Sequence, residues 1–233
     1  MTSVAAAQRA ALRAAFGASD SEEEACAPSG LAPRRAEQHA VVQGLALLRG
    51  FLSADAQAAL LAAVRAHGWA PAACGDVRDQ SMHFGHATLP RFARQLADDV
   101  AAAAAAHGML PPALAARTPA FNQFICNSYA PGQGIAAHVD LAAFGDGIAS
   151  VSLGAAVVMD WRHVADGREA AVLLQPGDLM MLHGAARYEW THGCARATEV
   201  GARCALLTQR VRAGSRRGRR MSGAERCCSG GTA

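Results

Sequence analysis

The second half of the chain consists of short apolar runs that turn residues interrupt at close intervals. Eight such runs follow one another from Phe121 onward, and Gly, Pro or Asp separates each from the next. They cover residues 121–129, 135–141, 148–153, 156–161, 171–174, 179–183, 187–192 and 204–212. Runs of this length between turn residues are typical of strands. About eight of them predict a double-sheet jelly roll, also called a double-stranded β-helix.

Two helices are expected before these strands. Residues 44–52 have the apolar content of a short strand that ends in a turn, and Ser53 then offers an N-cap for a helix whose apolar residues, through Val64, face inward. A second helix is expected over 89–107, because Pro90 suits the start of a helix and glycine and proline follow its end. The predicted fold class is therefore mostly β with flanking α, with the N-terminal helices packed on one sheet.

One folded domain is expected, because domains of more than about 250 residues tend to split and this chain has 233. We place this domain at 41–212. Residues 1–40 mix alanines, acids, prolines and arginines without a period, which predicts a disordered or targeting-like tail. Residues 213–233 are basic and too poor in apolar side chains to pack, which predicts a second disordered tail.

Charge and cysteine content bear on the compartment and on partners. The net charge is +3, but residues 210–233 hold seven arginines and one acid, so the body before them is acidic. An arginine-rich end could hold phosphates by charge alone. Seven scattered cysteines argue against a secreted disulfide framework. A cytoplasmic or nuclear location is expected, an organellar one is left open by the Ala/Arg-rich N-terminus, and no membrane partner is expected, since no apolar run reaches about 18 residues.

Three residues have the spacing of a metal site. His138 and Asp140 are two positions apart on an expected strand, so their side chains point to the same face. His192 follows 52 residues after the aspartate, within the last apolar runs. Two neutral imidazoles and one carboxylate form the facial triad that holds Fe(II) and leaves positions open for oxygen and a bidentate co-substrate. This pattern indicates an oxygen-activating enzyme; His163 and His183 also lie near strand ends but are not expected to bind metal.

Other motifs follow the same order as in a known family. They are Asn127-Ser-Tyr-Ala-Pro-Gly132, His138-x-Asp140, Ser150-Val-Ser-Leu-Gly154, Trp190-Thr-His-Gly193 and Arg210. Together they resemble the AlkB family of Fe(II)- and 2-oxoglutarate-dependent dioxygenases, over roughly residues 41–212. The resemblance implies that His138, Asp140 and His192 bind iron and form the catalytic centre. It also implies 2-oxoglutarate and O2 as co-substrates, with succinate and CO2 formed as a substrate C–H bond is oxidised.

The resemblance further implies a set of residues that bind 2-oxoglutarate. Asn127 and Tyr129 match an asparagine and a tyrosine that share one strand in the family. The family also carries two arginines six positions apart; Arg210 matches the second, while the position six residues earlier is Cys204. The nearest arginine is Arg203, which strand alternation would place on the opposite face unless a bulge re-aims it. On this basis Arg210→Ala is expected to abolish turnover of 2-oxoglutarate and Arg203→Ala only to weaken it.

The substrate implied by the resemblance is an alkylated or modified base in nucleic acid, with RNA favoured over DNA. Several segments look most like the branch of AlkB homologues that hydroxylates a modified wobble uridine in tRNA. The segment 78–85 resembles the family's nucleotide-recognition lid, in which His83 and Phe84 are candidates to stack on a flipped base. Packing under the second helix is the alternative role for these two residues. Oxidation of a protein side chain, or a non-catalytic binding module with a weakened 2-oxoglutarate site, are the alternative functions.

Overall fold

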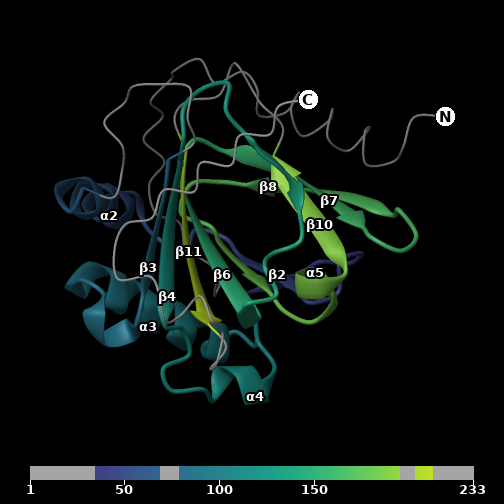
Figure 1. Cartoon of the computed structure of the whole chain (residues 1–233), viewed down its shortest axis with the longest axis horizontal. Helices are drawn as coiled ribbons and strands as arrows, with labels where there is room; N and C mark the ends of the chain where they lie inside the picture. The colour runs from purple at the N-terminus through teal and green to yellow at the C-terminus, as the bar shows by residue number, and fades with distance from the viewer. Residues whose placement is uncertain (1–34, 69–78, 195–202, 212–233) are drawn as a thin grey trace, which may run out of the picture.

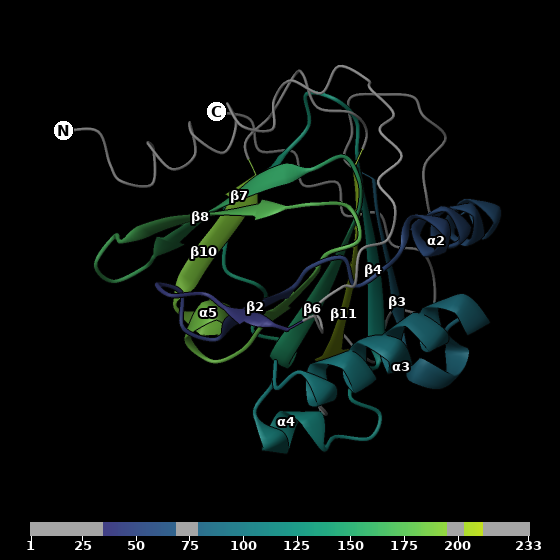
Figure 2. The ribbon, with the colours of Figure 1, turned by 180° about the vertical axis from the view of Figure 1, so that it is seen from behind.

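Two antiparallel β-sheets form the body of the protein, with helices on the outer side of the larger one (Figures 1 and 2). We describe a computed structural model, in which the described residues are 35–68, 79–194 and 203–211. The larger sheet has the order β1 (Glu37–Gln38), β2 (Leu45–Leu48), β9 (Leu179–Leu182), β6 (Phe144–Gly154), β11 (Arg203–Val211), β4 (Gln123–Tyr129) and β3 (Asp79–Phe84). The smaller sheet has the order β5 (Ile135–His138), β10 (Trp190–Cys194), β7 (Val157–His163) and β8 (Glu169–Leu174). The predicted jelly roll with flanking helices is confirmed.

Two long helices cover the outer face of the larger sheet, beside β3 and β4 (Figure 2). Helix α2 (Ala54–Ala66) begins at the expected N-cap, where the Ser53 hydroxyl accepts a hydrogen bond of 3.3 Å from Ala56 N. Helix α3 (Arg91–Ala106) follows Pro90, as the sequence predicts. The shorter helices are η1 (His86–Thr88), α4 (Pro112–Ala115) and α5 (Ala185–Tyr188).

The larger sheet contributes to two hydrophobic cores, because alternate side chains of a strand point to opposite faces. The core against the helices contains Val100 of α3 with Phe124 and Val151 of the sheet. The core between the two sheets contains, among others, Ile148, Met180, Trp161 and Trp190. Both tryptophans are almost fully buried. The face of β4 that looks toward the smaller sheet therefore carries the odd-numbered positions, which include Asn127 and Tyr129.

Several boundaries differ from those expected. Strand β1 lies inside the predicted N-terminal tail (1–40), where its two polar residues pair with Leu47 and Ala46 of β2; a strand of two polar residues shows no alternation in the sequence. Strand β10 begins at Trp190 rather than at residue 187, because α5 occupies the preceding turn. The basic tail (213–233) and most of the N-terminal tail lie outside the described residues. None of the described helices is long and apolar enough to cross a membrane.

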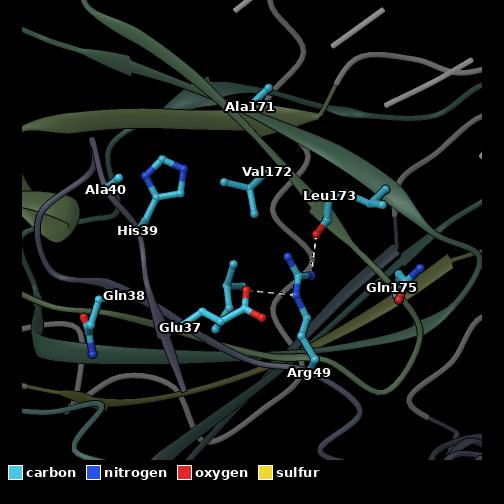
Figure 3. Close-up of a pocket in the computed structure, with 10 residues that line it drawn as sticks. Glu37, Gln38, His39, Ala40, Arg49, Ala171, Val172, Leu173 and Gln175 are labelled. Atoms are coloured by element: carbon cyan, nitrogen blue, oxygen red, sulfur yellow. Dashed lines mark hydrogen bonds and ion pairs between the residues drawn. The ribbon is translucent and has the colours of Figure 1, made fainter. Parts of the chain in front are cut away.

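A cavity of about 460 Å³ opens at the side of the two sheets, between β1–β2 and β8 (Figure 3). Arg49, just after β2, reaches across it and donates hydrogen bonds of 2.6 Å to Leu173 O and to Asp178 Oδ2. The Asp178 carboxylate also accepts from Gly50 N and Gln175 N, each at 2.9 Å. Because Asp178 is buried, this group ties the end of β2 to the turn between β8 and β9.

Replacing Asp178 with alanine is expected to lower the free energy of unfolding by about 2–4 kcal/mol, because two backbone N–H groups and one guanidinium lose a charged acceptor. Chemical denaturation measures this loss. Glu37→Gln is the control, since Glu37 is exposed and lies 3.7 Å from Arg49, and such surface pairs contribute at most about 1 kcal/mol. Equal losses for the two variants would contradict the assigned role of Asp178.

Candidate metal centre

His138, Asp140 and His192 converge at one edge of the smaller sheet. His138 ends β5 and is the Cα partner of His192 on β10, so the two imidazoles stand side by side with ring centroids 4.7 Å apart. Asp140 lies two residues beyond His138, and its carboxylate is 3.7 Å from His192 Nε2 and 4.0 Å from His138 Nε2. The three ligand atoms all lie within 4.8 Å of one another. Among the described residues, these are the three that group in this way.

Both imidazoles are suited to act as neutral ligands. His138 Nδ1 lies 2.9 Å from Ala136 O, and donating to that carbonyl leaves a lone pair on Nε2, the atom that faces Asp140. Burial lowers the pKa of His192 to about 4, with Asp140 opposing this shift and His138 and Arg187 adding to it. His192 is therefore uncharged near neutral pH and keeps its lone pair for a metal ion.

The buried polar atoms of this cluster fit a bound cation. Within the part of the chain that the structure describes, Asp140 Oδ2 and His192 Nδ1 are buried and hydrogen bond to nothing. A buried carboxylate oxygen without a donor costs stability, whereas a cation between the three side chains would satisfy it. Two nitrogen donors and one carboxylate oxygen are the donor set of non-haem Fe(II) oxygenases. The residues present therefore fit Fe(II).

Arg187, which the sequence analysis missed, supports the backbone that carries Asp140. This arginine of α5 is only 1% exposed, and its guanidinium donates to Asp140 O at 2.9 Å and to Leu141 O at 2.7 Å, with a longer contact of 3.4 Å to Phe144 O. Its guanidinium carbon also lies 4.8 Å from the centre of the Tyr188 ring. An arginine five residues before a ligand histidine gives no periodic signal, so only the structure reveals this contact.

Gly193 lets the two histidine-bearing strands approach each other. A Cβ at this position would lie 2.7 Å from Ile135 O and 2.8 Å from Ala137 N, which are both backbone atoms of β5. Gly193→Ala is expected to push β5 away from β10, to cost about 1–3 kcal/mol of stability and to weaken metal binding, because His138 moves away from His192. Titration with Mn(II) and thermal unfolding measure the two effects. Gly68→Ala is the control for Mn(II) affinity: a Cβ there meets nothing within 4 Å, but the φ of +73° disfavours alanine, so this variant should lose stability through backbone strain and keep the parent's affinity. Unchanged Mn(II) affinity in Gly193→Ala would contradict the expectation.

Asn127 and Tyr129 lie on the face of β4 that looks toward the smaller sheet, and both are buried. Tyr129 lines a small cavity of about 50 Å³ between the sheets. The same cavity is lined by Ser150 and Ser152 of β6 and by Cys194 of β10. Cys194 lies two residues beyond His192. Both serines belong to the motif Ser150-Val-Ser-Leu-Gly154, and their hydroxyl groups are polar groups of this cavity.

The register of β11 shows which of its positions lie on the same face of the larger sheet as Asn127 and Tyr129. Position 203 is the Cα partner of Tyr129, and position 205 is the Cα partner of Asn127, so position 203 lies on their face. By alternation, positions 204 and 210 lie on the opposite face, and the pairing with β6 is irregular between Gln209 and Val211. The positions six apart on the cavity face are therefore 203 and 209, occupied by Arg203 and Gln209, rather than Cys204 and Arg210.

The two candidates for base stacking fall on opposite faces of β3. His83 is the Cα partner of Phe124, which belongs to the core under the helices, and burial together with the charge of His67 lowers the His83 pKa to about 4. Phe84 is the partner of Gln123, on the face toward the smaller sheet. The register thus puts His83 on the face of β3 toward the helices and Phe84 on the opposite face. On the inner face, β3 contributes Gln80, whose side chain hydrogen bonds to Asn127.

Comparisons with known proteins agree with this site. Residues 63–222, more than half of the chain, match the family described as the 2OG-Fe(II) oxygenase superfamily. A stretch of 73 residues is 48% identical to tRNA (carboxymethyluridine(34)-5-O)-methyltransferase ALKBH8 from Macaca fascicularis and to the protein of that name from Xenopus tropicalis. This stretch is 31% of the chain but only 11% and 12% of those relatives.

The fold also matches a solved structure titled "The structure of OsALKBH1", with a TM-score of 0.53 at 17% identity, over 72% of this chain and 98% of that one. That match concerns the fold alone. The predicted fold and the predicted need for Fe(II) and 2-oxoglutarate are confirmed by the family match and by the triad. The chain belongs to the 2OG-Fe(II) oxygenase superfamily, and its similarity to proteins of the ALKBH8 and ALKBH1 names is partial or concerns the fold alone.

Proposed function

We propose that this dioxygenase demethylates or hydroxylates alkylated or modified bases in nucleic acid, with RNA, and tRNA in particular, favoured over DNA. The triad of His138, Asp140 and His192 carries the oxygenase part of the proposal. The choice of RNA is supported by the 73-residue similarity to proteins named as tRNA methyltransferases ALKBH8. Since the chain spans a small part of those relatives, their whole activity is not carried over.

Each part of the site has a proposed task. When bound, Fe(II) and 2-oxoglutarate supply the oxidation of a substrate C–H bond, which the side chains of the chain could not perform. The triad holds the metal at the edge of the smaller sheet, and Asn127, Tyr129 and Arg203 bind the co-substrate on the facing sheet. Oxidation of an N-methyl group gives a hemiaminal that loses formaldehyde, whereas oxidation of a carbon-bound position leaves a stable alcohol.

We rank Arg203 above Arg210 for the co-substrate, the reverse of the order expected from the sequence, and the pairing of position 203 with Tyr129 supports this choice. Arg203→Ala is expected to raise the KM for 2-oxoglutarate about 10- to 100-fold, because a carboxylate in a partly dry site loses a charged donor worth about 1.5–3 kcal/mol. Arg210→Ala is the matched control and is expected to change this KM by less than about threefold, since alternation from the paired positions 203–209 assigns position 210 to the other face. Steady-state succinate formation at varied 2-oxoglutarate measures both. A larger effect at Arg210 would restore the original ranking.

We also propose that the catalytic unit extends from β1 to β11, residues 37–211, and that residues before and after it are dispensable for binding metal. The two-residue strand β1 extends the larger sheet at one edge, and β11 lies near its centre. A truncated protein of residues 35–212 should therefore bind Mn(II) as the full chain does. Loss of Mn(II) binding on truncation would show that the tails belong to the unit.

Incubation with defined substrates tests the function itself. The full chain, with Fe(II), ascorbate and 2-oxoglutarate, is given tRNA, methylated oligonucleotides or methylated peptides, and the products are identified by mass spectrometry. Oxidised bases in tRNA with matching succinate are the expected result. Oxidation of peptides alone would favour the side-chain oxygenase. Absence of both succinate and metal uptake would favour the binding module.

A further inference from the structure

Asn127 has a hydrogen-bond partner on the neighbouring strand β3. Gln80 Nε2 donates to Asn127 Oδ1 at 2.6 Å, and the two residues are Cα partners across the β3–β4 pair. Asn127 is 4% exposed, and Gln80 is partly buried. Strand β3 is one of the two edge strands of the larger sheet in the described part of the chain, with β4 as its neighbour. A side chain of the sheet edge thus contacts a buried amide of the co-substrate face.

This bond distinguishes the two ends of the Asn127 amide. A primary amide has a carbonyl oxygen that accepts and an NH2 group that donates, and rotation by 180° exchanges them. Because Gln80 donates to the oxygen, the NH2 group is the end that Asn127 can offer to another ligand. Both carboxylates of 2-oxoglutarate are acceptors only, so they require a donor. With the amide turned round, its oxygen would face a carboxylate and repel it.

We propose that Gln80 is a positioning residue for the co-substrate: it fixes the Asn127 amide with the NH2 group available to a carboxylate of 2-oxoglutarate. The inference rests on the proposed function, in which Asn127 binds the co-substrate. The position of Gln80 supports this role, since its strand neighbours Ser81 and His83 are partners of residues on the helix side, whereas Gln80 pairs with the buried Asn127. Residue 80 lies outside the sequence motif that contains Asn127.

Three substitutions at residue 80 test whether its side chain must donate a hydrogen bond to Asn127: one side chain can only accept, one can only donate, and one can do neither. Glutamate is nearly isosteric with glutamine but, when ionised, only accepts, so Gln80→Glu turns the Asn127 amide round. Lysine only donates, so Gln80→Lys keeps the amide as it is. Methionine does neither and leaves the amide free to adopt both orientations. The readout is the Kd for 2-oxoglutarate of the full chain loaded with Mn(II), measured by anaerobic calorimetry, which needs no turnover.

The expected Kd rises about 10- to 100-fold in Gln80→Glu, which corresponds to loss of a hydrogen bond to a charged group. It rises about three- to tenfold in Gln80→Met and stays within about twofold in Gln80→Lys. A Kd in Gln80→Lys as weak as in Gln80→Met overturns the proposal, and so does an equal Kd in Gln80→Glu and Gln80→Met. Because the comparison of Gln80→Lys with Gln80→Met does not involve Gln80→Glu, the test holds even where Gln80→Glu does not fold.

A double-mutant cycle with Asn127→Ala shows whether the effect of residue 80 passes through Asn127. In the Asn127→Ala background, Gln80→Glu is expected to change the Kd by less than about threefold. A full-sized effect in that background means direct repulsion by the new charge and overturns the positioning role. An unchanged Kd in Asn127→Ala alone overturns the assignment of Asn127 in the proposed function, which is a different failure from an inert Gln80.

Discussion

Replacing Asp140 with alanine is expected to abolish Fe(II) binding and turnover while leaving the metal-free protein at least as stable as before. The variant loses one of three ligands, and the fall should exceed about a hundredfold, since even partners of metal ligands contribute 10- to 100-fold to affinity. Stability should not fall, because the deleted carboxylate has a buried oxygen without a hydrogen bond. Metal titration, succinate formation and thermal unfolding of the metal-free protein measure the three quantities.

Asp98→Asn is the control for loss of a carboxylate, since Asp98 is exposed on α3 and pairs with His86 on the surface. It should leave metal affinity and turnover unchanged. A metal-free Asp140→Ala protein that unfolds several degrees earlier than the parent would mean that Asp140 stabilises the fold itself. That outcome would remove the argument that this side chain is held ready for a cation.

Replacing Arg187 with methionine is expected to lower both the stability and the metal affinity. Methionine fills much of the same space, but the backbone carbonyls of Asp140, Leu141 and Phe144 each lose a charged donor, although Leu141 O keeps its bond from Phe144 N. At about 1–3 kcal/mol for each unsatisfied group, the free energy of unfolding should fall by about 3–5 kcal/mol. Because the loop carrying Asp140 is released, Mn(II) affinity should fall by about tenfold or more. Chemical denaturation and metal titration measure the two losses.

Arg94→Met provides a matched control, because Arg94 also donates to two backbone carbonyls, at 2.7 and 3.3 Å, but at a partly exposed position of α3. Water can replace its bonds, so the loss should be at most about 1 kcal/mol, with no change in metal affinity. If Arg187→Met loses stability yet binds Mn(II) as the parent does, the arginine supports the fold and not the ligand.

The sequence predicted most of the larger elements because their patterns are local. The strand runs from 121 onward, the Ser53 N-cap and the α3 helix each depend on residues within one turn or one strand of one another. The short elements were missed for the opposite reason. Strand β1 has two polar residues, and α5 is a single turn whose arginine is buried by residues more than forty positions earlier in the chain.

The grouping of His138, Asp140 and His192 was predictable because their spacing is itself the signal, whereas the face proposed to bind the co-substrate depends on strand register. Counting six residues back from Arg210 gave Cys204, but the pairing of β11 with β4 shows that the positions facing Tyr129 and Asn127 are the odd-numbered ones. An error of one residue exchanges the two faces of a strand. The same rule separates His83 from Phe84, and no count along the sequence shows which of them belongs to the inner face.

The short stretch from Arg187 to His192 holds both the guanidinium that supports the Asp140 loop and one of the two imidazoles of the triad. Its length is therefore constrained more tightly than its composition. Adding or removing a single residue between them would turn His192 to the far face of β10 or draw α5 out of reach of the carbonyls. In contrast, the turn at 164–168, between β7 and β8, carries neither the guanidinium nor the imidazole. It should accept an inserted residue without loss of enzyme activity.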